Sequence, residues 1–135
     1  MQSAAYAAPA ARSRLSAGQI VSAVPVLFLL FDTVIKLMVM DPVVESFGQL
    51  GYPMSAALGI GILELVCLAL YVTPRTSVFG AILLTGYLGG AVATHVRIGN
   101  PLLTHVLFPV YVGALLWGGL WLRESRLRGL VPLRA

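Results

Sequence analysis

Four long apolar runs, separated by short polar loops, constrain the fold of this chain more than any other feature. They cover roughly residues 18–38, 54–72, 77–95 and 102–122. A helix needs about 20 predominantly apolar residues to cross the hydrocarbon core of a bilayer, and each run has about this length. We therefore predict an all-α integral membrane protein whose four spanning helices pack as a bundle over residues 18–124.

The composition excludes several other classes of protein. Only 10% of the residues are charged and 59% are hydrophobic, whereas soluble domains carry about 25% charged residues. The 135 residues leave no room for a separate soluble domain beside four spans. The net charge of +4 comes from arginines that flank the apolar runs, so we predict no nucleic-acid partner. The single cysteine, Cys67, excludes an internal disulfide and a zinc cluster, and we predict no metal site.

Three segments lie outside the predicted spans. Residues 1–17 are rich in alanine and serine, and we expect a flexible N-terminal tail. Residues 41–50 place their apolar side chains on one helical face but are too few to span, so we predict a short helix in the membrane interface. Residues 125–135 form a basic C-terminal tail.

The arginines predict the orientation of the chain in the membrane. With a cytoplasmic N-terminus, one arginine (Arg97) lies outside, and the other seven lie inside. Positively charged residues accumulate on the cytoplasmic side of short loops. Both termini and the C-terminal tail are therefore predicted to be cytoplasmic. The seven arginines on the inner side are Arg12, Arg14, Arg75, Arg123, Arg126, Arg128 and Arg134.

Small residues four positions apart predict close helix contacts, because they allow helix backbones to approach in lipid. Gly86 and Gly90 form such a pair on the third span, and Ala57 and Gly61 form another on the second. Pro109 lies within the fourth apolar run and predicts a kink there, because proline interrupts the helical hydrogen bonds.

Asp32, Lys36 and Glu64 lie within apolar runs, where a central Asp or Lys costs about 2.5 to 3.5 kcal/mol. Asp32 and Lys36 are one helical turn apart on the same face. They are therefore either a simple intrahelical ion pair or part of a polar site. Glu64 has no partner on its own helix, and we predict that it faces a ligand. A pairing of Glu64 with Lys36 would remove the desolvation cost of both charges.

Further polar residues surround the loop between the third and fourth spans: His95, Arg97, Asn100 and His105. The topology places them near the same end of the bundle as Asp32 and Lys36, so we expect all these groups to converge on one cavity. The two histidines leave haem or metal ligation open, although their spacing specifies neither. We interpret Tyr87 as a packing or interfacial aromatic residue.

Several short motifs occur together in this sequence. They are Phe31-Asp32-xxx-Lys36-Leu37, Leu50-Gly51-Tyr52-Pro53, Gly61-Ile62-Leu63-Glu64, Pro74-Arg75-Thr76, Gly80-Ala81-Ile82-Leu83-Leu84 and Thr94-His95-x-Arg97. This ordered set resembles the DoxX-like family of small four-helix bacterial membrane proteins, over roughly residues 20–130. The resemblance implies a multi-pass protein of the bacterial inner membrane. Lys36, Glu64 and His95 match the recurrent polar positions of the family.

Two classes of function follow. In the first, the polar groups bind or transform a small lipophilic molecule by proton transfer, isomerisation or epoxide opening. Glu64 would be the general acid or base with His95 as its partner, and Lys36 would hold the carboxylate ionised or bind an oxyanion. Asp32 completes this catalytic set. The ligand-binding set comprises His105, Asn100 and Arg97.

In the second class, the chain is a non-catalytic accessory subunit of a quinone-coupled membrane redox complex. The same polar groups would then bind a quinone headgroup. No motif for another cofactor is evident in the sequence. The predicted partners are the lipid bilayer and a small lipophilic molecule, with a homo-oligomer or a redox-complex partner left open.

Overall fold

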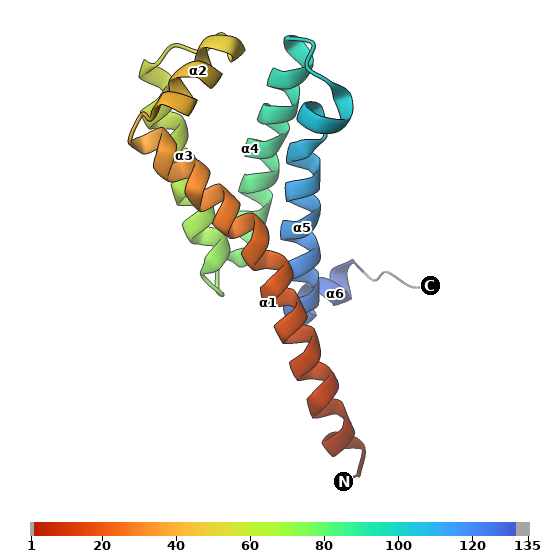
Figure 1. The fold of residues 1–135 in the computed structure, drawn as a ribbon. Coiled ribbons are helices and arrows are strands. Elements are labelled where there is room, and N and C mark those ends of the chain that lie inside the picture. The colour runs from red at the N-terminus through yellow and green to blue at the C-terminus, as the bar shows by residue number, and fades with distance from the viewer. Residues whose placement is uncertain (1, 132–135) are drawn as a thin grey trace.

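The computed structural model describes residues 2–131, which form helices joined by short loops (Figure 1). Four segments are long and apolar enough to cross a membrane: Arg12–Leu37, Ser55–Val72, Ser77–Arg97 and Leu102–Arg123. This confirms the prediction of an all-α protein with four spans. In chain order the helices are α1 (Gln2–Leu37), α2 (Asp41–Leu50), α3 (Ser55–Val72), α4 (Ser77–Arg97), the π-helical turn η1 (Leu102–Val106), α5 (Phe108–Arg123) and α6 (Ser125–Leu130).

The four long helices form a closed ring. Helix α1 packs against α3 and α5, and α4 also packs against α3 and α5. Helix α2 lies at one end of this ring and α6 at the other (Figure 1). We refer to these ends as the α2 half and the α6 half of the bundle. The pair α1–α3 and the pair α4–α5 lean apart toward the α2 half.

Close backbone approach between α1 and α5 holds the α6 half together. A Cβ atom on Gly119 would lie 2.7 Å from the backbone nitrogen of Ser22 and 3.0 Å from the carbonyl oxygen of Gly18. Ser22 Oγ also hydrogen-bonds to Tyr71 OH at 3.0 Å, and Tyr71 OH donates to the carbonyl oxygen of Leu116 at 2.6 Å. Three helices therefore meet at one buried point, and every hydroxyl there has a partner.

The apolar core lies beside this contact and extends through the ring. It is formed by residues that each spanning helix turns inward, and the largest of them are almost completely buried. Among the buried members are Leu29, Cys67, Leu68, Leu84, Leu88, Val112, Leu116 and Leu120.

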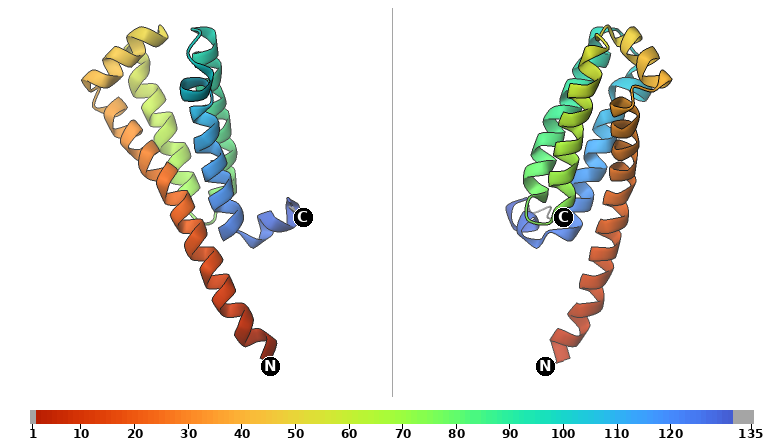
Figure 2. Two further views of the ribbon diagram at one scale, coloured as in Figure 1. Left: turned by 45° about the vertical axis from the view of Figure 1, so that its right-hand side comes forward. Right: turned by 90° about the vertical axis from the view of Figure 1, so that its left-hand side faces the viewer.

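The segments outside the spans are largely helical. Helix α1 begins at Gln2 and its N-terminal part extends past the other helices (Figure 2). Residues 2–17, the segment expected to be a flexible tail, therefore continue the first helix. Helix α2 covers the interval expected for it and buries Val43 and Phe47 against Ala57, while its interfacial location stays a prediction. Residues 132–135 of the expected C-terminal tail lie outside the described residues.

The fourth apolar run consists of two helical pieces. The π-helical turn η1 ends before Leu107, and α5 begins at Phe108 with Pro109 in its first turn. Proline has no N–H to donate and is well accommodated in the first turn of a helix. The expected kink is therefore a change of helix type just before Pro109.

The two small-residue pairs differ in their surroundings. A Cβ atom on Gly61 would lie 3.2 Å from Cβ of Lys36, and Ala57 is fully buried, so this pair lies at a helix contact as predicted. A Cβ atom on Gly86 or Gly90 would have no atom of a neighbouring helix within 4 Å. The prediction of a contact at this pair is wrong for the described part of the chain, because these glycines face out of the ring.

Candidate functional site

Gly61 positions the ionisable side chains of α1 and α3. Its missing side chain allows the last turn of α1 to approach α3, and Lys36 and Leu37 pack over it. Glu64 lies three residues further along α3 on the same helical face. The close approach therefore brings Lys36 within reach of Glu64, although the two residues belong to different helices.

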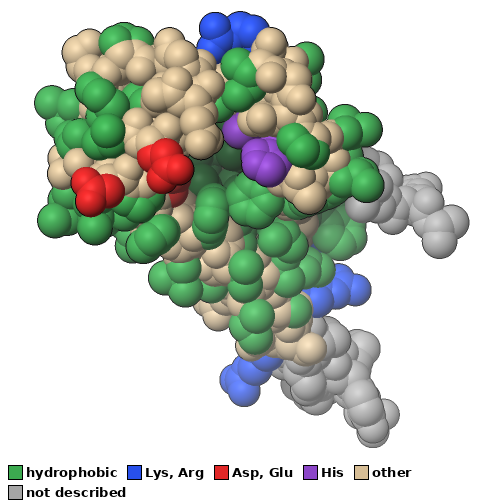
Figure 3. Space-filling view, turned by 45° about the horizontal axis from the view of Figure 1, so that its top comes forward, with side chains coloured by type: hydrophobic (Ala, Val, Ile, Leu, Met, Phe, Trp, Pro, Cys, Tyr) green, Lys and Arg blue, Asp and Glu red, His purple; other side chains and the backbone are tan. Residues whose placement is uncertain are grey.

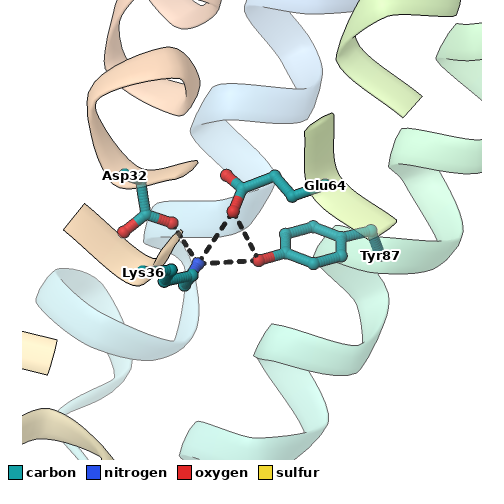
Figure 4. Close-up of polar contacts among 4 residues, drawn as sticks. All are labelled: Asp32, Lys36, Glu64 and Tyr87. Carbon is teal, nitrogen blue, oxygen red and sulfur yellow. Dashed lines mark hydrogen bonds and ion pairs between the residues drawn. The ribbon is translucent and has the colours of Figure 1, made fainter. Parts of the chain in front are cut away.

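Four side chains then meet around the lysine ammonium (Figure 4). Lys36 Nζ forms an ion pair with Asp32 Oδ2 one turn earlier on α1. It also donates to Glu64 Oε2 at 2.9 Å and to the hydroxyl oxygen of Tyr87 at 2.8 Å. Tyr87 OH donates to Glu64 Oε2 at 3.0 Å. We call Asp32, Lys36, Glu64 and Tyr87 the lysine cluster, and it joins α1, α3 and α4.

The lysine cluster uses all of its hydrogen-bond donors internally. An ammonium has three N–H bonds and a phenol has one O–H, and all four are engaged by partners within the cluster. One buried acceptor of the cluster is not used: within residues 2–131, Glu64 Oε1 has no hydrogen-bond partner. Figure 4 shows this oxygen pointing away from Lys36 and Tyr87. This oxygen is therefore the buried atom of the cluster that is free to accept a hydrogen bond or a proton.

Exposure differs across the lysine cluster. The side chain of Glu64 is fully buried, that of Lys36 is 12% exposed and that of Asp32 is 29% exposed. A molecule that reaches the cluster would therefore meet Asp32 first and Glu64 last.

Tyr87 is the member of the cluster that the sequence interpretation missed. A tyrosine within an apolar run is usually a packing residue or part of an aromatic belt. One signal was available in the sequence. Tyr87 lies one helical turn after Leu83 and Leu84 and directly before Leu88, and a buried phenol needs a polar partner. The identity of that partner depends on how α4 faces α1 and α3.

The polar residues at the end of α4 form a second, separate group. His95 Nδ1 lies 2.7 Å from Asn100 Nδ2, and the ring centroids of His95 and His105 are 5.8 Å apart. His105 Nδ1 lies 2.8 Å from Thr104 Oγ1. We call His95, Asn100 and His105 the histidine group. The Nδ1 atoms of both histidines are engaged in these contacts.

Arg97 belongs to neither group. Its Nη2 atom donates to the carbonyl oxygen of Leu50 at 2.6 Å, at the end of α2. Its guanidinium also lies 6.0 Å from the ring centroid of Tyr52, and Tyr52 OH hydrogen-bonds to Thr94 Oγ1 at 2.8 Å. These contacts tie the end of α2 to the end of α4.

The polar residues expected to converge therefore form two hydrogen-bonded groups, and their convergence on one cavity stays a prediction. Asp32, Lys36 and Glu64 meet as predicted, with Tyr87 added. Among residues 2–131, no hydrogen bond or ion pair joins this cluster to the histidine group, so Glu64 and His95 are not hydrogen-bonded to each other. The reason is geometric: Glu64 lies near the middle of α3, whereas His95 lies in the last turn of α4.

The surface is hollowed between the side that carries acidic residues and the side that carries the two histidines (Figure 3). Apolar side chains form most of the visible interior of this hollow. A separate apolar pocket of about 350 Å³ lies in the α6 half, between α5 and α6. Its lining is Trp117, Gly118, Trp121, Leu127 and Val131, so none of the candidate polar residues faces it.

Large apolar side chains cover the outside of the four spans, among them Leu27, Phe31 and Phe79, and these faces contact the lipid bilayer. The architecture therefore defines a four-span helical membrane protein with an ionic cluster inside its bundle. The chain belongs to the DoxX-like family, whose model matches residues 20–119. This confirms the resemblance drawn from the ordered motifs. Comparison with curated proteins and with solved structures finds no match.

Proposed function

We propose that this DoxX-like protein binds a small lipophilic molecule that arrives from the bilayer, and that the lysine cluster receives its polar group. One observation carries this proposal: Glu64 is fully buried, yet its Oε1 atom has no hydrogen-bond partner among residues 2–131. An unpaired buried acceptor costs about 1 to 3 kcal/mol, and more when it is charged. A bound molecule that supplies a partner would recover this energy.

The hydrogen-bond donors of the lysine cluster are all engaged within it, which supports Glu64 as an acceptor of a hydrogen bond or proton. Lys36 has no N–H left for a developing oxyanion, and Tyr87 has no O–H left. Epoxide opening requires a group that donates to the epoxide oxygen, whereas proton transfer and isomerisation begin with a group that accepts a proton. The geometry therefore favours Glu64 as an acceptor of a hydrogen bond or proton, with Asp32 and Lys36 as its supports.

We propose that the histidine group lines the access route. His95 is partly buried, His105 is exposed, and the histidines lie at the rim of the hollow in Figure 3. Asn100 orients the His95 ring through Nδ1, and Arg97 holds the adjacent end of α2. The proposed roles of these residues are to orient and admit the molecule rather than to react with it.

The alternative function, an accessory subunit that binds a quinone, places different demands on the site. A quinone headgroup presents two acceptor oxygens and needs donors. The donors of the lysine cluster are already engaged, so the observation favours the first function.

Native mass spectrometry of the protein extracted from its own membrane tests the proposal. We expect the wild-type protein to retain a lipophilic molecule, and the double variant Lys36→Met/Glu64→Leu to fold without it. The variant Glu45→Gln, which removes an exposed carboxylate on α2, is the control and should retain the molecule. A stable double variant that carries the same molecule as the wild type would show that the cluster is only scaffolding.

A further inference from the structure

The charge of the lysine cluster indicates which polar group its ligand carries. The cluster contains two carboxylates, Asp32 and Glu64, and one ammonium, Lys36. With both carboxylates ionised, its formal charge is −1. Among residues 2–131, no second cation forms a salt bridge with either carboxylate. In that state the cluster is one positive charge short of balance inside an apolar bundle.

An uncompensated charge within the bilayer is costly, and buried charges are found paired. A neutral hydroxyl would satisfy Glu64 Oε1 but would leave the excess negative charge in place. A carbonyl, an ether or an epoxide would add a second acceptor beside an existing one. A protonated amine supplies both the missing positive charge and the missing hydrogen-bond donors.

The lysine cluster already shows this kind of recognition internally. Lys36 Nζ bridges Asp32 Oδ2 and Glu64 Oε2, so the two carboxylates already share one ammonium through one oxygen each. The side of Glu64 that carries Oε1 faces away from that ammonium (Figure 4). Asp32 is the most exposed of the three charged members of the cluster.

We infer that the lipophilic molecule is an amine, whose protonated nitrogen donates to Glu64 Oε1 and is drawn in by Asp32. This inference rests on the proposed function and names the chemical class of its ligand. The apolar part of the molecule would lie along the hydrophobic interior of the hollow in Figure 3.

Four probes of similar chain length separate charge from hydrogen bonding. Dodecylammonium carries a charge and hydrogen-bond donors, and dodecyltrimethylammonium carries a charge without a donor. Dodecanol has an uncharged hydroxyl that donates and accepts, and 2-tridecanone has only an acceptor. Their dissociation constants are measured by titration calorimetry with the full chain in an uncharged maltoside detergent. We expect dodecylammonium to bind about tenfold or more tightly than dodecanol and dodecyltrimethylammonium, because hydrogen bonds between charged groups are the strong ones. The ketone should bind most weakly.

Variants of the lysine cluster test which side chains produce the preference for dodecylammonium. Glu64→Gln keeps the shape and one acceptor oxygen but removes the charge, so it should lose at least about tenfold of the dodecylammonium affinity and little of the dodecanol affinity. Asp32→Asn, at a partly exposed position, is a second variant that should weaken the ammonium selectively. Glu45→Gln removes an exposed carboxylate outside the cluster and should leave all four dissociation constants unchanged.

The outcomes distinguish this inference from the proposed function. If the ketone or the alcohol binds as tightly as the amine, and all binding falls together in the cluster variants, the site exists but the amine assignment is wrong. If the amine binds equally to the wild type, Glu64→Gln and Asp32→Asn, both the assignment and the proposed site are wrong. Failure of all four probes to bind also overturns the amine assignment.

Discussion

The two halves of the bundle are held together by different interactions. In the α6 half, Gly18 and Ser22 of α1 touch the backbone of α5 at Gly119, and no side chain separates them. In the α2 half, the pair α1–α3 leans away from the pair α4–α5 (Figure 1), and the hydrogen bonds of Tyr87 on α4 to Lys36 and Glu64 connect the two pairs. Backbone contact leaves no space for a ligand, whereas a polar cluster between separated helices leaves an acceptor to receive one. The bundle thus combines a closed half with a half that we propose as the binding site.

The largest expected effect on stability comes from removing one partner of the buried ion pair in the lysine cluster. Lys36→Met leaves Glu64 buried without its cation, and breaking a buried pair costs about 3 to 5 kcal/mol. Replacing both partners, as in Lys36→Met/Glu64→Leu, should recover most of this loss. The measurement is the free energy of unfolding of both variants in mixed micelles.

Arg75→Met is the control for this prediction, because Arg75 is exposed in the loop between α3 and α4. It should change the free energy of unfolding by no more than about 0.5 kcal/mol. A double variant as unstable as Lys36→Met would mean that the α2 half does not depend on the pairing of these two charges.

The next largest effect tests the backbone contact of the closed half. Gly119→Ala places a Cβ atom against the backbone of Ser22, and such overpacking costs about 1 to 3 kcal/mol. The same substitution at Gly86 meets no atom within 4 Å. It should be neutral or stabilising by up to about 1 kcal/mol, because alanine favours the helix over glycine. Melting temperatures of the two variants in one detergent give the comparison directly. Equal losses at both positions would show that the outward face of α4 is also a contact.

A smaller effect is expected for the phenol that the sequence did not reveal. Tyr87→Phe removes the hydrogen bond to Glu64 and an acceptor for Lys36, while the Lys36–Glu64 pair remains. A loss of about 1 kcal/mol in unfolding free energy follows. Tyr111→Phe is the matched control, since Tyr111 is exposed and its OH donates to the Leu103 carbonyl at 3.2 Å. If Tyr87→Phe loses no more stability than Tyr111→Phe, the hydroxyl of Tyr87 does not stabilise the cluster.

The orientation of the two halves can be tested without any change in stability. We predict that the α2 half faces outward and the α6 half faces the cytoplasm, as the distribution of arginines indicates. Cysteines introduced at Ser46 and Ser125, with Cys67 replaced by alanine, should react with an impermeant reagent from opposite sides of the membrane. Reaction of both from the same side would contradict the predicted topology.

The sequence alone determined the architecture, because spanning a bilayer imposes a length and an apolar composition that can be read along one dimension. The intervals of α2, α3 and α4 and the number of spans follow from that constraint. Part of the candidate site follows from it too: Asp32 and Lys36 are a helical turn apart by geometry, and a buried carboxylate such as Glu64 requires a partner.

Only the tertiary structure decided which partners meet. The rotation of α4 directs Tyr87 into the lysine cluster and turns Gly86 and Gly90 outward, although both features lie on the same helix. The positions of Glu64 along α3 and of His95 along α4 separate the lysine cluster from the histidine group. Small residues only permit a close approach, and polar residues only require a partner. The choice among the available contacts is made by the packing of all four helices together, which no single apolar run contains.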